Sequence, residues 1–137
     1  MDCLFCKIVK KEIPSSIIYE DSDVMAFLDI APVHKGHVLV VPKVHSDDFL
    51  STEDDILDKT MKAAKKIAGA VVKATGAHGI NVSINNGAAA GQVIFHLQIH
   101  LIPRFDEDNL EPWPKVAYEE NEMKHFAEKI KKAINEN

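Results

Sequence analysis

The stretch Phe95-His96-Leu97-Gln98-Ile99-His100-Leu101-Ile102-Pro103-Arg104 decides how this chain folds and what it could do. Side chains on a β-strand alternate between its two faces, so residues 96, 98 and 100 would share one face, roughly 7 Å apart along the strand. The apolar residues between them would then point into a core. We therefore expect a strand over residues 94–102 that carries a functional site on its polar face.

Hydrophobic patterns on both sides of this strand predict the other elements. Helical spacing predicts a helix over residues 4–13, and a long helix that is capped by Thr52 and ends at Gly76. The predicted strands are residues 16–20, 24–29, 36–41, 80–84 and 94–102, with a glycine-bounded loop over 85–91 and a final helix over 123–134. Hairpins interrupted by one long helix indicate an α+β fold with a mainly antiparallel sheet of about five strands.

Length and composition restrict the class of protein. The 137 residues can form their own core, and we expect one domain over residues 1–137. The formal net charge of −5 argues against sequence-independent binding to nucleic acid. No apolar run approaches the ~18 residues of a membrane span, and the N-terminus lacks a basic stretch followed by an apolar signal core. We expect a cytoplasmic protein that binds neither membranes nor nucleic acid.

The two cysteines, Cys3 and Cys6, have C-x-x-C spacing. In a cytosolic chain this spacing indicates metal or redox chemistry rather than a structural disulfide. A pair of reduced thiols on a short helix is the alternative. His45 and His96 would complete a Cys2His2 set, and thiolates with imidazoles are the ligands that structural Zn²⁺ prefers.

Residues 3–105 resemble the histidine triad (HIT) family. Residues 91–104 are similar to its signature His-φ-His-φ-His-φ-φ, in which φ is apolar, and further matches lie at residues 3–8, 12–14, 19–21, 26–30, 35–37 and 40–45. The resemblance implies a HIT-type fold with a motif-bearing core over 3–105 and a C-terminal extension with a helix over 106–137. It also implies a homodimer, joined through the sheet edges and the long helix, and a structural zinc in bacterial-type members with this C-x-x-C.

The resemblance implies a purine nucleotide site. Family members bind AMP moieties and cleave the bond to the α-phosphate of phosphoramidates or dinucleoside polyphosphates, through a covalent bond to the middle histidine. His37, His96 and His100 match family site positions, and Asp29 matches the carboxylate that holds the ribose. Matches to the base pocket and the phosphate cradle are Phe5, Ile8, Phe27, Ile30, Asn85, Gly91, Gln92 and Val93. For the four apolar residues, a place in the core is the alternative.

Gln98 departs from the family pattern at the position of the nucleophile. The lone pair of an amide nitrogen is delocalised and will not attack phosphorus, although its NH2 could still donate to a phosphate oxygen. Three explanations stay open: an engineered loss of the nucleophile, a natural non-catalytic nucleotide binder, or a mechanism rerouted through another histidine. Val93 is a second departure, because many members have Ser or Thr there. A zinc-stabilised scaffold without nucleotide affinity is a further alternative, of a different class.

Overall fold

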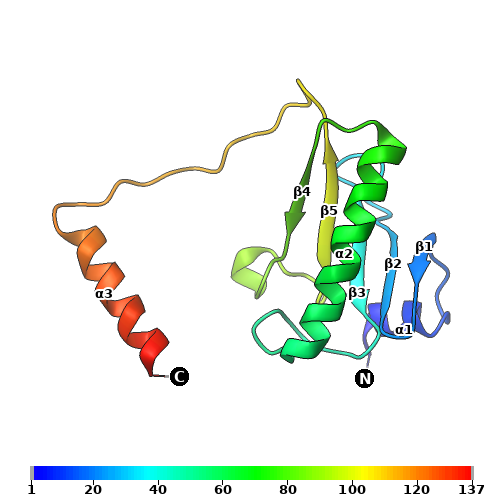
Figure 1. The fold of residues 1–137 in the computed structure, drawn as a ribbon, viewed down its shortest axis with the longest axis horizontal. Coiled ribbons are helices and arrows are strands. Elements are labelled where there is room, and N and C mark those ends of the chain that lie inside the picture. The colour runs from blue at the N-terminus through cyan, green and yellow to red at the C-terminus, as the bar shows by residue number, and fades with distance from the viewer. Residues whose placement is uncertain (1, 137) are drawn as a thin grey trace.

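The computed structural model describes residues 2–136 and confirms the predicted α+β fold with an antiparallel sheet (Figure 1). Among the described residues, five strands pair in the order β1-β2-β3-β5-β4. The strands are β1 (Ile17–Glu20), β2 (Val24–Leu28), β3 (Val38–Pro42), β4 (Gly79–Ser83) and β5 (Ile99–Arg104). The helices are α1 (Leu4–Val9), α2 (Asp54–Thr75), the short 3-10 helix η1 (Ala88–Ala90) and α3 (Glu122–Asn135).

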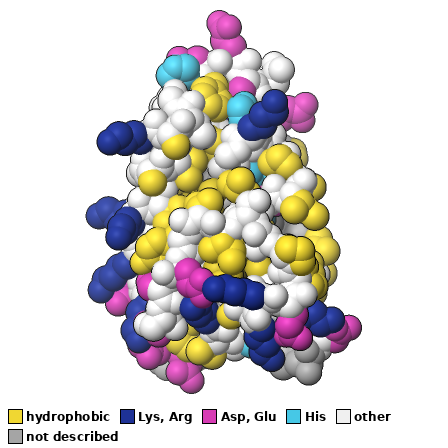
Figure 2. Space-filling model, turned by 90° about the vertical axis from the view of Figure 1, so that its right-hand side faces the viewer, with side chains coloured by type: hydrophobic (Ala, Val, Ile, Leu, Met, Phe, Trp, Pro, Cys, Tyr) yellow, Lys and Arg dark blue, Asp and Glu magenta, His cyan; other side chains and the backbone are white. Residues whose placement is uncertain are grey.

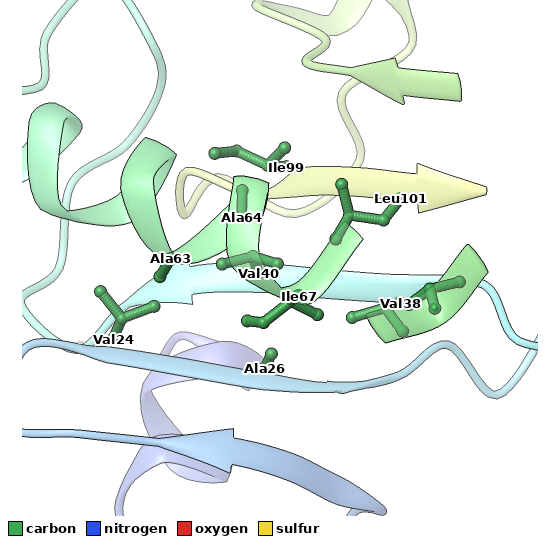
Figure 3. Packing of buried hydrophobic residues seen from close by; sticks show 10 residues of the cluster. Val24, Ala26, Val38, Val40, Ala63, Ala64, Ile67, Ile99 and Leu101 are labelled. Atoms are coloured by element: carbon green, nitrogen blue, oxygen red, sulfur yellow. The ribbon is translucent and has the colours of Figure 1, made fainter. Parts of the chain in front are cut away.

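Alternation along the strands gives the sheet two apolar faces. On one face, side chains of β3 and β5 pack against α2 (Figure 3). Val40, Leu101 and Ile67 meet there and are all buried. On the other face, Leu39 of β3 clusters with Phe5 of α1. The sheet is therefore a central layer, with α2 on one side and the shorter α1 on the other.

The long helix α2 begins one residue later than the predicted cap requires. Its N-cap is Glu53, whose side chain makes no capping bond. The predicted cap, Thr52, is wrong because its hydroxyl donates instead to the carbonyl of Asp48. Gly76 ends the helix as predicted, in a left-handed conformation with φ 71°. None of the helices within residues 2–136 is long and apolar enough to cross a membrane.

The strand that carries the site is shorter than the sequence predicts. β5 begins at Ile99, and residues 94–98 form an irregular segment instead of the start of a strand. The N–H of Leu97 donates to the carbonyl of Ser46 (2.7 Å), so the loop before α2 and not a neighbouring strand fixes this segment. Apolar alternation continues through it nevertheless, since Leu97 and Ile99 are both buried.

A shallow apolar hollow of about 340 Å³ lies between α2 and the strands β1 and β2. Ile18 and Leu28 line it from the strands, and Ile67 and Ala70 line it from α2. Figure 2 shows hydrophobic side chains gathered across the middle of the face that carries β1, with Lys and Arg along its margins.

Residues 105–136, here called the C-terminal arm, leave the sheet after β5 and end in α3. Arg104 and Asp108 hold the start of the arm with two N–H···O bonds of 2.9 and 2.7 Å. Figure 1 shows α3 standing apart from the sheet, beyond its β4 side. α3 contributes no buried residue, and Phe126 and Ile130 on its apolar side are exposed.

Candidate functional site

A cavity of about 480 Å³ opens on the face of the sheet that carries α1. Its apolar wall comes from α1, β2 and β3, where Phe5 and Phe27 pack edge to face with ring centroids 5.4 Å apart. Leu39, which the sequence did not single out, completes this wall because it is the alternate residue of β3 on this face. The cavity is therefore built from the same cluster that docks α1 on the sheet.

The structure brings most of the predicted site residues together around this cavity. Two of them lie at its mouth rather than in a closed wall, since Ile30 is 98% exposed and Val93 is 85% exposed. His37 and His96 do not line the cavity, and both are buried. The predicted residues that do line it are Phe5, Ile8, Phe27, Asp29, Ile30, Asn85, Gly91, Gln92, Val93, Gln98 and His100.

His37 and His100 form a hydrogen-bonded pair at the polar end of the cavity. His37 precedes β3 and is buried, whereas His100 lies on β5 and lines the cavity. The Nε2 of His37 lies 3.0 Å from the Nδ1 of His100. Burial lowers the pKa of both histidines, so both rings are neutral at pH 7.

Hydrogen bonds determine which nitrogen of each ring carries the proton. The backbone N–H of Val33 donates to the Nδ1 of His37 (3.1 Å), so the proton of this neutral ring is on Nε2. That Nε2–H donates to the Nδ1 of His100, which leaves the proton of His100 on its own Nε2. His100 therefore offers a ligand an N–H donor and not a lone pair.

Asp29 follows β2 and lines the same end of the cavity. Its Oδ1 accepts the N–H of Ala31 (2.9 Å), and its Oδ2 lies 3.8 Å from the Nε2 of His37. The carboxylate can still accept from a ligand hydroxyl, because each oxygen has two lone pairs. Asp29, His37 and His100 could also surround a metal ion, but both nitrogens of His37 already have hydrogen-bond partners.

The loop between β4 and β5 brings Asn85 and residues 91–93 to the cavity. The buried side chain of Gln92 braces this loop: its Nε2 donates to the Asp47 carbonyl (2.8 Å), and its Oε1 accepts the N–H of Gly87 (2.9 Å). Gly91 has φ 98°, and a Cβ there would approach the Nδ2 of Asn85 to 3.4 Å. A glycine at 91 thus lets the loop turn tightly beside Asn85.

Gln98 lines the cavity on the same side as His100. Its Nε2 donates to the carbonyls of Ile94 (3.0 Å) and His96 (3.1 Å). Donation from this NH2 to a phosphate oxygen, which stays a prediction, would require one of these two backbone bonds to break. The irregular path of residues 94–98 creates this arrangement by turning the two carbonyls toward the side chain.

A cluster of sulfur and nitrogen donors, here called the Cys2His2 cluster, lies behind the cavity and could hold a metal ion. The Sγ atoms of Cys3 and Cys6 and ring nitrogens of His45 and His96 lie within 4.8 Å of one another. Cys3 Sγ is 3.5 Å from His96 Nδ1, and Cys6 Sγ is 3.3 Å from His45 Nδ1. A tetrahedral ion with bonds of about 2.3 Å to sulfur and about 2.0 Å to nitrogen separates such atoms by about 3.5 Å.

Further hydrogen bonds turn both histidines toward the Cys2His2 cluster. The Nε2 of His45 lies 2.7 Å from Asp47 Oδ1, and the Nε2 of His96 lies 2.8 Å from the Pro42 carbonyl. Each contact places the ring proton on Nε2 and leaves Nδ1 available to bind a metal. Burial raises the pKa of the Cys6 thiol, so a bound cation is what would hold two thiolates together here. The donor set and its geometry fit a metal ion.

The fold and the paired histidines define a HIT-type α+β domain, and comparison with known proteins agrees. The HIT domain family matches residues 10–107, so the chain belongs to the histidine triad family. It is 38% identical over 136 residues to the adenosine 5'-monophosphoramidase of Schizosaccharomyces pombe, which covers 98% of this chain and 99% of that protein.

Solved structures extend the likeness to nearly the whole chain. A Streptococcus mutans crystal structure superposes with a TM-score of 0.91 at 44% identity, covering 97% of this chain and 85% of that one. A zinc-bound histidine triad protein of Mycobacterium smegmatis superposes with a TM-score of 0.77 at 34% identity, covering 97% of this chain and 98% of that one.

Proposed function

We propose that the protein binds purine nucleotides in the cavity and that its own turnover at the α-phosphate is absent or strongly reduced. The cavity carries this proposal, because an apolar wall leads to Asp29 and His100, with an amide at position 98. A purine base can pack against Phe5 and Phe27, while ribose hydroxyls can donate to Asp29. The S. pombe relative, an adenosine 5'-monophosphoramidase, supports a ligand of this class.

The loss of turnover follows from the chemistry of position 98. The family reaction needs a neutral imidazole that attacks phosphorus and later leaves. The amide nitrogen of Gln98 has no available lone pair, and both of its N–H bonds are held by backbone carbonyls. Removing a nucleophile typically costs several powers of ten in rate. A protein of this kind would act as a nucleotide-binding regulatory module.

A hydrolase rerouted through another histidine has less support. His96 is fully buried, and its two ring nitrogens face Cys3 and the Pro42 carbonyl. The Nδ1 of His100 accepts from His37, and its Nε2 carries the proton. Neither ring offers the cavity a lone pair with which to attack.

Calorimetric titration with adenosine, AMP and adenosine 5'-phosphoramidate tests the binding site. Binding of at least one of them is expected, and Asp29→Asn should weaken it about tenfold or more, because a hydrogen bond to a carboxylate is lost. Asp58→Asn, on the exposed side of α2, is the matched control and should change nothing. The proposal is wrong if none of the three ligands binds.

We further propose that the Cys2His2 cluster holds a structural zinc. Its two thiolates and two imidazoles are the ligands this ion prefers, and the zinc-bound M. smegmatis structure supports the assignment. Four protein ligands leave no open position, so the ion would not activate water. Its role would be to tie α1 to the loop after β3 and to the segment before β5, which keeps the apolar wall of the cavity in place.

We also propose that the protein is a homodimer in which the C-terminal arm packs on the second copy. β4 is an edge strand with half-exposed Val82, and α3 lies beyond that edge (Figure 1). The S. mutans crystal structure superposes over 97% of this chain, a share that extends into the arm. A lone helix of this length is marginal in water, so its apolar side needs a partner surface, and a second copy at the β4 edge could supply it.

Size-exclusion chromatography with light scattering tests the dimer. The chain mass is 15.2 kDa, and twice this value is expected at micromolar concentration. The double variant Phe126→Glu/Ile130→Glu should shift the equilibrium toward the monomer, whereas Lys132→Glu on the opposite side of α3 should not. A natural protein that runs as a monomer would contradict the dimer, and a fully dimeric double variant would contradict the role of α3.

A further inference from the structure

The orientation of the Gln98 amide determines what the cavity offers a ligand at its polar end. Its Nε2 lies 3.0 Å from the Ile94 carbonyl and 3.1 Å from the His96 carbonyl. Carbonyl oxygens only accept hydrogen bonds, so an amide turned the other way would set three oxygens against one another. The NH2 group is therefore fixed on the backbone side.

The oxygen of the same amide consequently points away from the two backbone carbonyls, and it is not buried without a partner. Gln98 lines the cavity, and within residues 2–136 no hydrogen bond reaches its Oε1. Position 98 thus offers a ligand a hydrogen-bond acceptor only. An imidazole in this place could take up a proton and turn toward an anion as a donor, but a neutral amide cannot.

The charges around the cavity do not offset this acceptor oxygen. The residues that line it include one carboxylate, Asp29, and neither Lys nor Arg. His37 and His100 are neutral at pH 7 because burial lowers the pKa of each. A doubly charged phosphate placed between Gln98 and Asp29 would meet acceptor oxygens and no cationic side chain. The side chains of the lining that could donate to it are neutral ones, His100, Asn85 and Ser15, whose hydroxyl has no other partner within the described residues.

We propose that Gln98 makes this cavity selective for purine nucleoside ligands with a hydrogen-bond donor at the 5' end, in preference to the nucleoside monophosphate dianion. The shared chemistry is an O–H or N–H group aimed at Oε1, as in the 5'-hydroxyl of adenosine or the amine of adenosine 5'-phosphoramidate. The inference rests on the proposed purine site and adds the ligand class that this site takes. Position 98 is then a specificity-determining residue instead of a nucleophile.

The expected difference in affinity depends on whether the Oε1 of Gln98 has a hydrogen-bond partner in the complex. A donor on the ligand satisfies the oxygen of Gln98, whereas an anionic oxygen in the same place leaves it unpaired and repelled. Hydrogen bonds that involve a charged group change affinity by about tenfold to hundredfold, and a mismatch at such a group costs at least as much. We expect adenosine and the phosphoramidate to bind about tenfold or more tightly than AMP.

Calorimetric titration at pH 7.5, where AMP is mainly the dianion, tests this preference with adenosine, adenosine 5'-phosphoramidate and AMP. Gln98→Met keeps the length of the side chain without its acceptor oxygen, and should bring the affinity for AMP closer to that for adenosine. Gln98→His can take up a proton beside the phosphate, and should favour AMP. The phosphoramidate and adenosine together show whether the donor may sit on phosphorus or on the ribose.

Two results would overturn the inference. One is tighter binding of AMP than of adenosine to the natural protein, and the other is an AMP-to-adenosine ratio that Gln98→Met leaves unchanged. Failure of the proposed function gives a different pattern, because then the natural protein binds none of the three ligands and Gln98→His binds neither adenosine nor AMP.

Discussion

If the Cys2His2 cluster holds the proposed zinc, loss of one thiolate should both release the ion and loosen the cavity. Cys6 lies 3.3 Å from His45 and 3.6 Å from His96, so Cys6→Ser removes a central donor of the set. Phe5 and Ile8 of α1 line the cavity and are buried in the same cluster as Cys3. Without the metal, α1 is held on the sheet mainly by packing of this cluster, in which burial of each large apolar side chain is worth about 1.5–3 kcal/mol.

The expected magnitude follows from linkage between binding and folding. A metal present at about a thousand times its dissociation constant stabilises the folded state by about 4 kcal/mol. For a domain of this size, about 4 kcal/mol corresponds to about 10–20 °C in Tm. Cys6→Ser, or chelation of the natural protein, should lower Tm by this amount and weaken nucleoside binding through the loosened α1.

Metal content by mass spectrometry, Tm by calorimetry and ligand affinity by titration measure the three effects together. Asp47→Asn is the matched control, because it keeps all four donors and changes only the partner of His45 Nε2. It should lower metal affinity about 10–100-fold and leave the metal bound in excess zinc. A Cys6→Ser variant that retains one zinc per chain and the Tm of the natural protein would refute the role of Cys6 as a metal ligand.

Three further results are expected. Burial lowers the pKa of His37 and His100. Their contribution to the free energy of unfolding is therefore complete above about pH 6.5, the ordinary pKa of histidine, and is lost as pH falls. His100→Gln should flatten the dependence of the free energy of unfolding on pH between 7 and 5, measured by urea titration. Hydrogen bonds from Arg104 hold the pKa of Asp108 at about 2, so this ion pair holds the start of the arm. Asp108→Asn should therefore speed tryptic cleavage after Arg104. Unchanged cleavage would contradict a role of Asp108 in holding the arm. Gly36 has φ 95°, and a Cβ there would lie 2.9 Å from Thr75 Cγ2. Gly36→Ala should therefore lower the free energy of unfolding in urea by about 1–3 kcal/mol. The control Gly69→Ala, in open space on α2, should leave it unchanged or raise it.

The faces of the sheet could be predicted from sequence because burial follows a period of two. Leu39 and Val40 fall on opposite faces as the alternation requires, and Ile99 and Leu101 join the face of α2. The irregular path of residues 94–98 could not be predicted, because polar and apolar residues keep alternating there. A bond from Leu97 to the distant Ser46 determines that path.

The residue types of the site were visible in the sequence, but the state of each group was not. The C-x-x-C spacing indicated metal or redox chemistry, and the resemblance to the family supported His45 and His96 as the other two donors. The tautomer of His100, in contrast, depends on the N–H of Val33 acting through His37. The direction of the Gln98 amide depends on two backbone carbonyls that face it only because residues 94–98 leave the strand path.

Whether position 98 has lost the nucleophile of an otherwise intact site is the central question. Hydrolysis of adenosine 5'-phosphoramidate should be measured for the natural protein and for Gln98→His side by side, at a ligand concentration that saturates both. We expect the natural protein to be inert, and Gln98→His to gain several powers of ten in rate, because His37, His100 and Asp29 already stand in place. Turnover by the natural protein at a rate equal to that of Gln98→His would contradict the account.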